Sequence, residues 1–382
     1  METTREADGW ETVTGLLETN DTYGRPPRAG YPLGSYTYDW SAQGYTLGGT
    51  IDYVHFPPAN PGPGTKKLLL LHGHSSSVHE FDDLYDYLGD FDVYSFDQPC
   101  CGTSSEVHID GVEGYATHQG YPAVFACLHF LRDLTKEFVN HVVQPSGSDL
   151  YVAGGSLGGN VALWVAEDNP PWLTKTFVWS PGSAWPDDVP LKPQAIATLD
   201  GWAKSVWTRD TFLAKAFGRL PCLNPQPWYW YWDCWAQWCT DASPCQRTGS
   251  RACELCQQQP GVPGGDGYPG IGARKAHYIE AAYAAVGAAF TNTRARWHWR
   301  VAREEVQFTH QANIQRVGSP VVFMAGDRDD DPTAGLFEPT RELFRKVSAT
   351  LTPTRGLGLT ETGHSVHNER PVSLAAVLNG AP

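Results

Sequence analysis

The chain has 382 residues, of which 41% are hydrophobic and 18% charged, and its net charge is −14. A chain of this size can bury a large core, as one domain with an insertion or as two domains. The acidic balance, without a basic stripe, argues against a nucleic-acid partner. No apolar run is long enough to span a membrane, and the polar start does not resemble a secretory leader. We therefore expect a cytoplasmic protein without a membrane span.

The first part of the chain predicts an irregular segment followed by a β-hairpin. Residues 1–34 are rich in Gly, Pro, Thr and Arg, which is typical of an irregular N-terminal arm. Two strand-like runs follow at residues 35–40 and 45–56, joined by a turn at Gln43-Gly44. Strand, turn and strand in this order are typical of a hairpin.

Continuous apolar runs then alternate with segments of helical spacing. The run Lys67–His72 is typical of a strand buried on both faces in a parallel sheet. Alternating strands and helices predict a mostly parallel sheet covered by helices on both faces, the α/β class. The other predicted strands cover residues 92–97, 150–153, 176–180, 320–326 and 355–359, and the predicted helices cover residues 81–88, 120–143, 336–347 and 369–378.

The stretch 183–317 breaks this rhythm, and we interpret it as a helical lid inserted into a core made of residues 35–182 and 318–382. It holds the aromatic block Trp228–Trp238 and six clustered cysteines. Disulfides, which would imply an oxidising compartment, a zinc site that includes Cys253-x-x-Cys256, and free thiols remain open as interpretations. The six are Cys222, Cys234, Cys239, Cys245, Cys253 and Cys256.

The most informative motif is Gly154-Gly155-Ser156-Leu157-Gly158, which matches the pattern G-x-S-x-G. A strand-like run precedes it and an apolar helical segment follows. In a nucleophile elbow the serine sits on a turn so tight that its neighbours must lack side chains. We therefore predict that Ser156 is a nucleophile; a glycine-rich turn without chemistry is the alternative.

A serine hydroxyl is a poor nucleophile at neutral pH, so an adjacent base must take its proton. His364 follows the last predicted strand, where a loop can bring an imidazole over the elbow, and His367 is its local rival. A carboxylate must fix the tautomer of that imidazole, and aspartates follow the predicted strand 320–326. We choose Asp329 as this acid, with Asp327 as the alternative; the order serine, acid, histidine fits this architecture.

The oxyanion that forms during acyl transfer needs preorganised N–H donors. The backbone of Leu157, directly after the nucleophile, can supply one, and His74 in the loop after the strand 67–72 can supply the second. His72 and His74 alone are a weak metal signal, because no matching carboxylate or cysteine set accompanies them. We expect no metal and no organic cofactor.

Four motifs in this order resemble the α/β-hydrolase superfamily. His72-Gly73 looks like the oxyanion loop of that superfamily, and Gly326-x-x-Asp329 looks like its acid loop. Residues 96–104 resemble its turn D-x-P-G-x-G-x-S, with Cys100 in place of the first glycine. The loop from Gly363 to Pro371, which carries His364, is similar to the histidine loop of lysophospholipase-like and monoacylglycerol-lipase-like members.

The resemblance implies an α/β-hydrolase fold and a serine hydrolase that cleaves a carboxylic ester or related acyl bond of a small-molecule substrate through an acyl-enzyme. An acyltransferase is the first alternative, because Gly154–Gly159 looks like the elbow of homoserine acetyltransferases. A ligand-binding protein that kept the fold and lost turnover is the second alternative.

Overall fold

The structure, a computed structural model, describes residues 1–16, 30–31, 33–42, 45–62, 64–74, 76–107, 127–145, 150–186, 188, 192–216, 288–327, 329, 336–351, 353–360 and 362–380. The strands in this part of the chain are β1 (Glu2–Arg5), β2 (Glu11–Thr14), β3 (Leu33–Ala42), β4 (Tyr45–Phe56), β5 (Lys66–Leu71), β6 (Phe91–Phe96), β7 (Leu150–Gly155), β8 (Leu173–Trp179), β9 (Val321–Gly326) and β10 (Arg355–Leu359).

These strands form one sheet in the order β1-β2-β10-β9-β8-β7-β5-β6-β4-β3. The pairs from β2 through β10, β9, β8, β7 and β5 to β6 are parallel, whereas β1 pairs with β2, and β4 with β6 and β3, in antiparallel fashion. Parallel strands require crossover connections, so all their carboxyl ends meet at one edge of the sheet. The predicted mostly parallel sheet and the predicted hairpin are confirmed.

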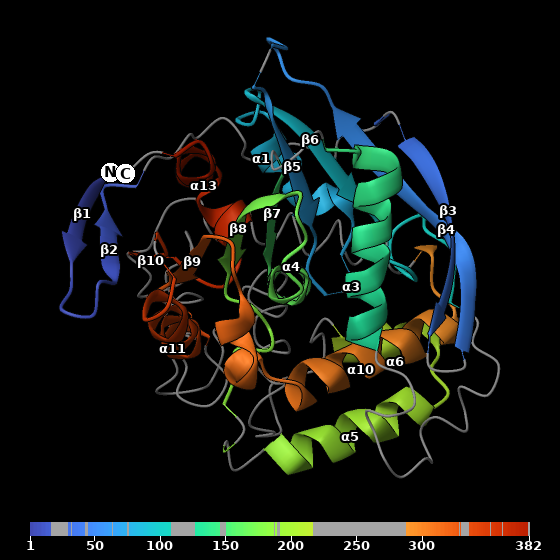
Figure 1. Ribbon diagram of the computed structural model, residues 1–382. Coiled ribbons are helices and arrows are strands. Elements are labelled where there is room, and N and C mark those ends of the chain that lie inside the picture. The colour runs from blue at the N-terminus through green and yellow to red at the C-terminus, as the bar shows by residue number, and fades with distance from the viewer. Residues whose placement is uncertain are drawn as a thin grey trace, which may run out of the picture.

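Helices cover both faces of the sheet (Figure 1). Helices α3, α4 and α11 contribute to the core on one face, and α1, α12 and α13 to the core on the other. The α-helices described are α1 (Asp82–Tyr85), α3 (Cys127–Phe138), α4 (Leu157–Glu167), α5 (Lys192–Lys204), α6 (Arg209–Ala216), α10 (Asn292–Gln307), α11 (Phe337–Ser348), α12 (Val366–Glu369) and α13 (Pro371–Leu378). They are joined by the short 3₁₀ helices η2 (Val78–Phe81), η4 (His310–Ala312) and η5 (Ile314–Arg316) and the π-helix η3 (Val139–Val143).

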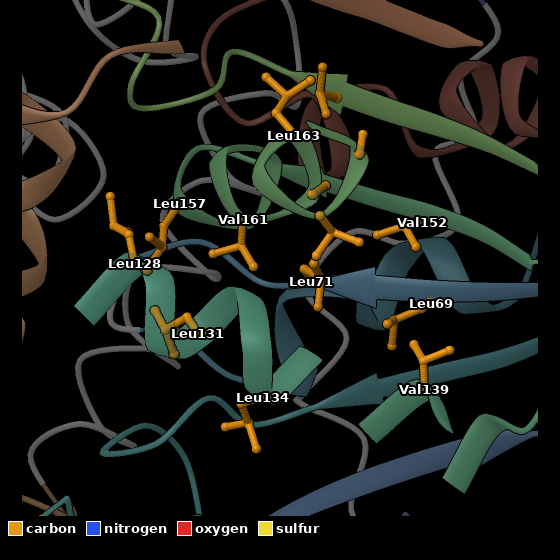
Figure 2. Packing of buried hydrophobic residues seen from close by; sticks show 14 of the residues in the cluster. Leu69, Leu71, Leu128, Leu131, Leu134, Val139, Val152, Leu157, Val161 and Leu163 are labelled. Atoms are coloured by element: carbon orange, nitrogen blue, oxygen red, sulfur yellow. The ribbon is translucent and has the colours of Figure 1, made fainter. Parts of the chain in front are cut away.

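Strand β5 shows why the apolar runs of the sequence become central strands. Leu69 and Leu71 belong to the core under α3 and α4, whereas Leu68 and Leu70 belong to the opposite core. Figure 2 shows the first pair against the leucines and valines of α3 and α4. Because successive side chains of a strand point to opposite faces, a strand buried on both sides must be apolar throughout. Burial of each such leucine side chain stabilises the folded chain by roughly 1.5–3 kcal/mol.

An irregular arm was expected at residues 1–34, but within the described residues 1–16 the strands β1 and β2 extend the sheet. Strand β2 pairs in parallel with β10, and the buried Trp10 packs on Gly356, where an added Cβ would lie 2.2 Å from its ring. Arg341 of α11 also lies 2.8 Å from Asp8. These contacts join residues far apart in the sequence. The polar pattern of the first residues alone therefore did not predict the strands β1 and β2.

Part of the predicted lid falls among the described residues. Helices α5, α6 and α10 lie within 183–317, and α5 packs against α10. The six clustered cysteines and the aromatic block Trp228–Trp238 lie outside the described residues. The lid therefore stays a prediction. Among the described helices, none is long and apolar enough to cross a bilayer.

Candidate active site

Ser156 lies on the turn between β7 and α4 with φ +51° and ψ −123°. This left-handed backbone conformation is strained for a residue with a side chain, and a nucleophile elbow has the same property. The Ser156 N–H donates to the carbonyl of Trp179, and its carbonyl accepts from Gly182 and Asn160, with distances between 2.9 and 3.1 Å. The backbone bonds on both sides of the turn therefore hold the strained conformation.

The glycines around Ser156 lie where side chains have no room. A Cβ at Gly155 would lie 1.8 Å from Nε1 of Trp179, and a Cβ at Gly158 would lie 1.8 Å from the Leu71 carbonyl oxygen. Helix α4 therefore begins directly against the ends of β5 and β7. Its first residue, the buried Leu157, was predicted to supply an oxyanion donor from its backbone.

The structure brings together the predicted acid and base. Nδ1 of His364 lies 3.0 Å from Oδ2 of Asp329, and both side chains are buried. Because a carboxylate accepts a hydrogen bond, it favours the tautomer with the proton on Nδ1 and the lone pair on Nε2. Asp327, the alternative acid, instead accepts a hydrogen bond from the Thr362 N–H at 3.2 Å. Of the two aspartates, Asp329 is the one bonded to His364.

Ser156 and His364 follow strands of the same parallel sheet, so both lie at its carboxyl edge. His367, three residues after His364, accepts a hydrogen bond at 3.0 Å from the indole N–H of Trp179, the ring that borders Gly155. The hydrogen bonds that Ser156 makes in the described part of the chain run through its backbone. A link between its hydroxyl and His364 is therefore a proposal.

The loop after β5 is held by two buried side chains. Glu80 of η2 accepts the Gly73 N–H at 2.7 Å, and the imidazole Nδ1 of His72 lies 2.8 Å from the Gly73 carbonyl oxygen. The other imidazole nitrogen accepts the N–H of Gln98 at 2.9 Å, and burial lowers the pKa of His72 to about 4. A Cβ at Gly73 would lie 3.6 Å from Cβ of Ser156, so this loop borders the candidate nucleophile.

The side chain of His74 connects the same loop to α10. Its Nδ1 lies 2.8 Å from Oε2 of Glu305, and its Nε2 lies 3.1 Å from the backbone carbonyl oxygen of His298. Burial lowers the pKa of His298 well below its usual range. The side chain of His74 is thus engaged with α10, so an oxyanion donor at this position would have to be its backbone N–H.

Cys100 occupies a left-handed position, with φ +65°, in the turn after β6. The resemblance places glycine here, and the structure explains that preference: only glycine adopts this conformation without steric cost. The turn folds around the buried Asp97, whose carboxylate accepts the N–H groups of Val78 and Thr103 at 2.8 Å each. Burial raises the pKa of Cys100 to about 12, so its thiol stays protonated.

A small pocket lies between the turn after β6, α6 and α10. Phe212 of its wall contacts the ring of His298 at a centroid distance of 5.2 Å, and His298 contacts His74 at 4.1 Å. The pocket is thus two ring contacts from the loop that borders Ser156. It is lined by Cys100, Cys101, Gly102, Phe212, Ala289, Phe290 and Arg294.

Sequence reasoning missed two carboxylates that hold the candidate site together. Glu369 accepts the Gly363 N–H at 2.6 Å, and its place inside the histidine loop could have indicated it. Glu80 lies seven residues after Gly73 in no motif, so nothing in the sequence pointed to it. Within the described residues, no group of three or more His, Cys, Asp or Glu side chains is arranged to hold a metal ion.

Comparisons with known proteins identify the family and support the fold. Residues 68–377 match the model of the Alpha/beta hydrolase family. A search of the curated proteins finds no match. The chain is similar in structure to a thermophilic esterase from Thermogutta terrifontis (13% identity, 91% of this chain and 97% of that chain covered, TM-score 0.56).

Two further solved structures resemble the chain. They are MenH from S. aureus (13% identity, 86% and 96% covered, TM-score 0.55) and a probable hydrolytic enzyme from Pseudomonas aeruginosa PAO1 (15% identity, 92% and 94% covered, TM-score 0.53). Such low identities support the fold alone, whereas the family model spans most of the sequence. The chain belongs to the alpha/beta hydrolase family.

Proposed function

We propose that the protein is a serine hydrolase that cleaves a carboxylic ester or a related acyl bond, with Ser156, Asp329 and His364 as its catalytic triad. The observation that carries this proposal is the buried pair of Asp329 and His364, 3.0 Å apart, at the sheet edge where Ser156 has φ +51°. The family assignment agrees with it.

In the proposed reaction, Nε2 of His364 takes the proton of Ser156 as the serine oxygen attacks the substrate carbonyl carbon. The backbone N–H groups of Leu157 and His74 stabilise the resulting oxyanion. The intermediate then collapses, and the leaving alcohol takes its proton from His364. Water, deprotonated by the same imidazole, attacks the acyl-enzyme and releases the acid together with a free Ser156 hydroxyl.

The pocket between the turn after β6, α6 and α10 is our candidate for the acyl part of the substrate. Phe212 and Phe290 give it an apolar wall, and its contact through His298 keeps it close to the loop that borders Ser156. The likeness of residues 363–371 to the loop of lysophospholipase-like and monoacylglycerol-lipase-like proteins makes lysophospholipids and monoacylglycerols the first natural ester classes to test. Residues 183–317 would form the lid, which supplies α6 and α10 to the wall of this pocket.

The test is hydrolysis of short p-nitrophenyl esters by the Ser156→Ala variant. We expect turnover to vanish while the circular dichroism spectrum and the melting temperature stay close to those of the wild type. Retained turnover in a folded variant would overturn the serine mechanism. Product analysis with an added alcohol acceptor separates hydrolysis from acyl transfer, the alternative that the Gly154–Gly159 elbow suggests.

A further inference from the structure

Glu80 contacts two loops of the candidate site, the loop after β5 and the loop that carries His364 and His367. Its side chain comes from η2, and the residue is 3% exposed. One carboxylate oxygen, Oε2, accepts the Gly73 N–H at 2.7 Å, and the other, Oε1, lies 3.2 Å from Nε2 of His367. Gly73 borders Ser156, and His367 follows His364 by three residues. A single buried carboxylate therefore contacts both the oxyanion loop and the histidine loop.

The protonation of His367 is determined by its neighbours. The indole of Trp179 can only donate, so Nδ1 of His367 must accept its hydrogen bond. Burial, reinforced by His364 nearby, lowers the pKa of His367 to about 3, so the imidazole is neutral at physiological pH. The ring proton is then on Nε2, the nitrogen that faces Glu80. The contact between Glu80 and His367 is thus a neutral imidazole N–H against a carboxylate.

The Gly73 contact has a direct consequence for the proposed oxyanion donor. Peptide units are planar, so a peptide whose carbonyl is held also has its N–H direction fixed. Glu80 holds the His72–Gly73 peptide by its N–H, and His72 holds the following peptide, which carries the His74 N–H, by its carbonyl oxygen. Releasing Gly73 from Glu80 would free the first peptide and leave the second held by the His72 contact, so the direction of that donor would be less firmly fixed.

Removing the Glu80 carboxylate from water costs free energy of folding, so its contacts are weak evidence that this residue serves to stabilise the fold. We propose that Glu80 is a positioning residue that keeps the oxyanion loop and the histidine loop in register, so that the donor at position 74 and the base at position 364 stay correctly spaced around Ser156. This inference rests on the proposed serine hydrolase function. Glu80 contacts neither substrate nor reacting atoms in this role.

The experiment compares Glu80→Gln with the wild type. Gly73 and His367 face different oxygens of Glu80, and a glutamine replaces one of these oxygens by an NH₂ group, which cannot accept; one of the two N–H groups would then face a donor. We expect kcat on a p-nitrophenyl ester, and the rate of fluorophosphonate labelling at Ser156, to fall by about 10- to 100-fold, while KM changes by less than about 3-fold. A loss confined to KM would contradict the inference.

The matched control is Glu167→Gln. Glu167 is also a buried glutamate that contacts a histidine, with Oε1 2.7 Å from Nδ1 of His310 at the far end of α4. A purely structural role for Glu80 predicts that the two variants lose similar amounts of melting temperature and of kcat. Our inference predicts similar losses of melting temperature but a kcat within about 2-fold of the wild type for Glu167→Gln only. Equal losses of kcat would overturn it.

Two variants of His367 keep the inference testable if Glu80→Gln fails to fold. In His367→Gln the amide oxygen can accept from Trp179 and the amide nitrogen can donate to Glu80, whereas His367→Phe can do neither. We expect His367→Gln to keep labelling within about 3-fold of the wild type and His367→Phe to lose at least about 10-fold. Equal rates for the two would overturn the inference. A wild-type protein that is not labelled at Ser156 would instead contradict the proposed function itself.

Discussion

Asp329 and His364 come from the loops after two neighbouring strands, β9 and β10, and Oδ2 of Asp329 lies 3.0 Å from Nδ1 of His364. The adjacent loops are also bonded by Asp327, which accepts the Thr362 N–H. One aspartate thus contacts the imidazole and the other fastens the loop that carries it. The structure therefore distinguishes Asp329 from Asp327, which the sequence offered as alternative partners of the imidazole.

Replacing Asp329 by asparagine keeps the shape of the side chain but removes the charge that selects the His364 tautomer. We expect kcat for ester hydrolysis to fall on the order of 10³- to 10⁴-fold, as for a triad whose imidazole has the wrong tautomer. Steady-state kinetics above pH 7 would measure it. The control is Asp327→Asn, which keeps an acceptor oxygen for Thr362 and should stay within about 5-fold of the wild type. A larger loss for Asp327→Asn than for Asp329→Asn would reverse the two roles.

The elbow glycines predict opposite effects for two alanine substitutions. In Gly158→Ala the new Cβ would lie 1.8 Å from a backbone oxygen of Leu71, whereas nothing lies within 4 Å of a Cβ at Gly201 in α5. We expect Gly158→Ala to abolish hydrolysis and to lower the free energy of unfolding by about 1–3 kcal/mol or more. Gly201→Ala should raise it by up to about 1 kcal/mol, because alanine favours helix. Urea denaturation measures both, and a stable, active Gly158→Ala variant would contradict the tight elbow.

Cys100 gives a test of backbone strain. Its left-handed conformation costs a residue with a Cβ roughly 1–2 kcal/mol, and glycine avoids this cost. Cys100→Gly and Cys100→Ala both remove the sulfur that accepts the Val107 N–H, so their difference isolates the backbone. We expect the glycine variant to be more stable than the alanine variant by about 1 kcal/mol in urea denaturation. The opposite order would show that the turn does not need the left-handed conformation.

The buried histidines predict a loss of stability in mild acid. Burial lowers the pKa of His72 to about 4 and that of His367 to about 3, from an ordinary value of 6.5. Between pH 6.5 and the lowered pKa values, the unfolded chain binds protons that the folded chain does not. The free energy of unfolding therefore falls as pH falls below about 6.5. The His367→Gln variant lacks one of these groups, so its melting temperature should decline less steeply between pH 6.5 and 4. A decline parallel to that of the wild type would exclude a contribution from His367.

The sequence predicted those parts of the fold that have a strong local pattern. The apolar run of β5 and the glycine pattern around Ser156 can be recognised within a few residues, so a buried strand and a tight turn could be predicted before the structure. The groups that leave these glycines no room, Trp179 and Leu71, are distant in the sequence. The pairing of Asp329 with His364 could be predicted because chain order and strand ends constrain where an acid and a base can lie. The bond between them is a property of the folded chain.

The remaining features depend on contacts between distant residues, which no local sequence pattern indicates. Strand β2 is short and polar, and it is stabilised by pairing with β10 near the other end of the chain. The contact between His74 and Glu305 spans 231 positions, and it turns a predicted oxyanion-loop side chain toward α10. Glu80 has no spacing relative to Ser156 that would indicate chemistry. Tertiary packing alone gives these residues their roles.

Labelling with a fluorophosphonate, followed by peptide mapping by mass spectrometry, tests the central claim most directly, because it measures the reactivity of the serine without knowledge of the natural substrate. We predict one adduct, on Ser156, in the wild type and a rate at least about 100-fold lower in His364→Ala. No adduct on Ser156, or an unchanged rate in His364→Ala, would contradict the activation of this serine by this imidazole.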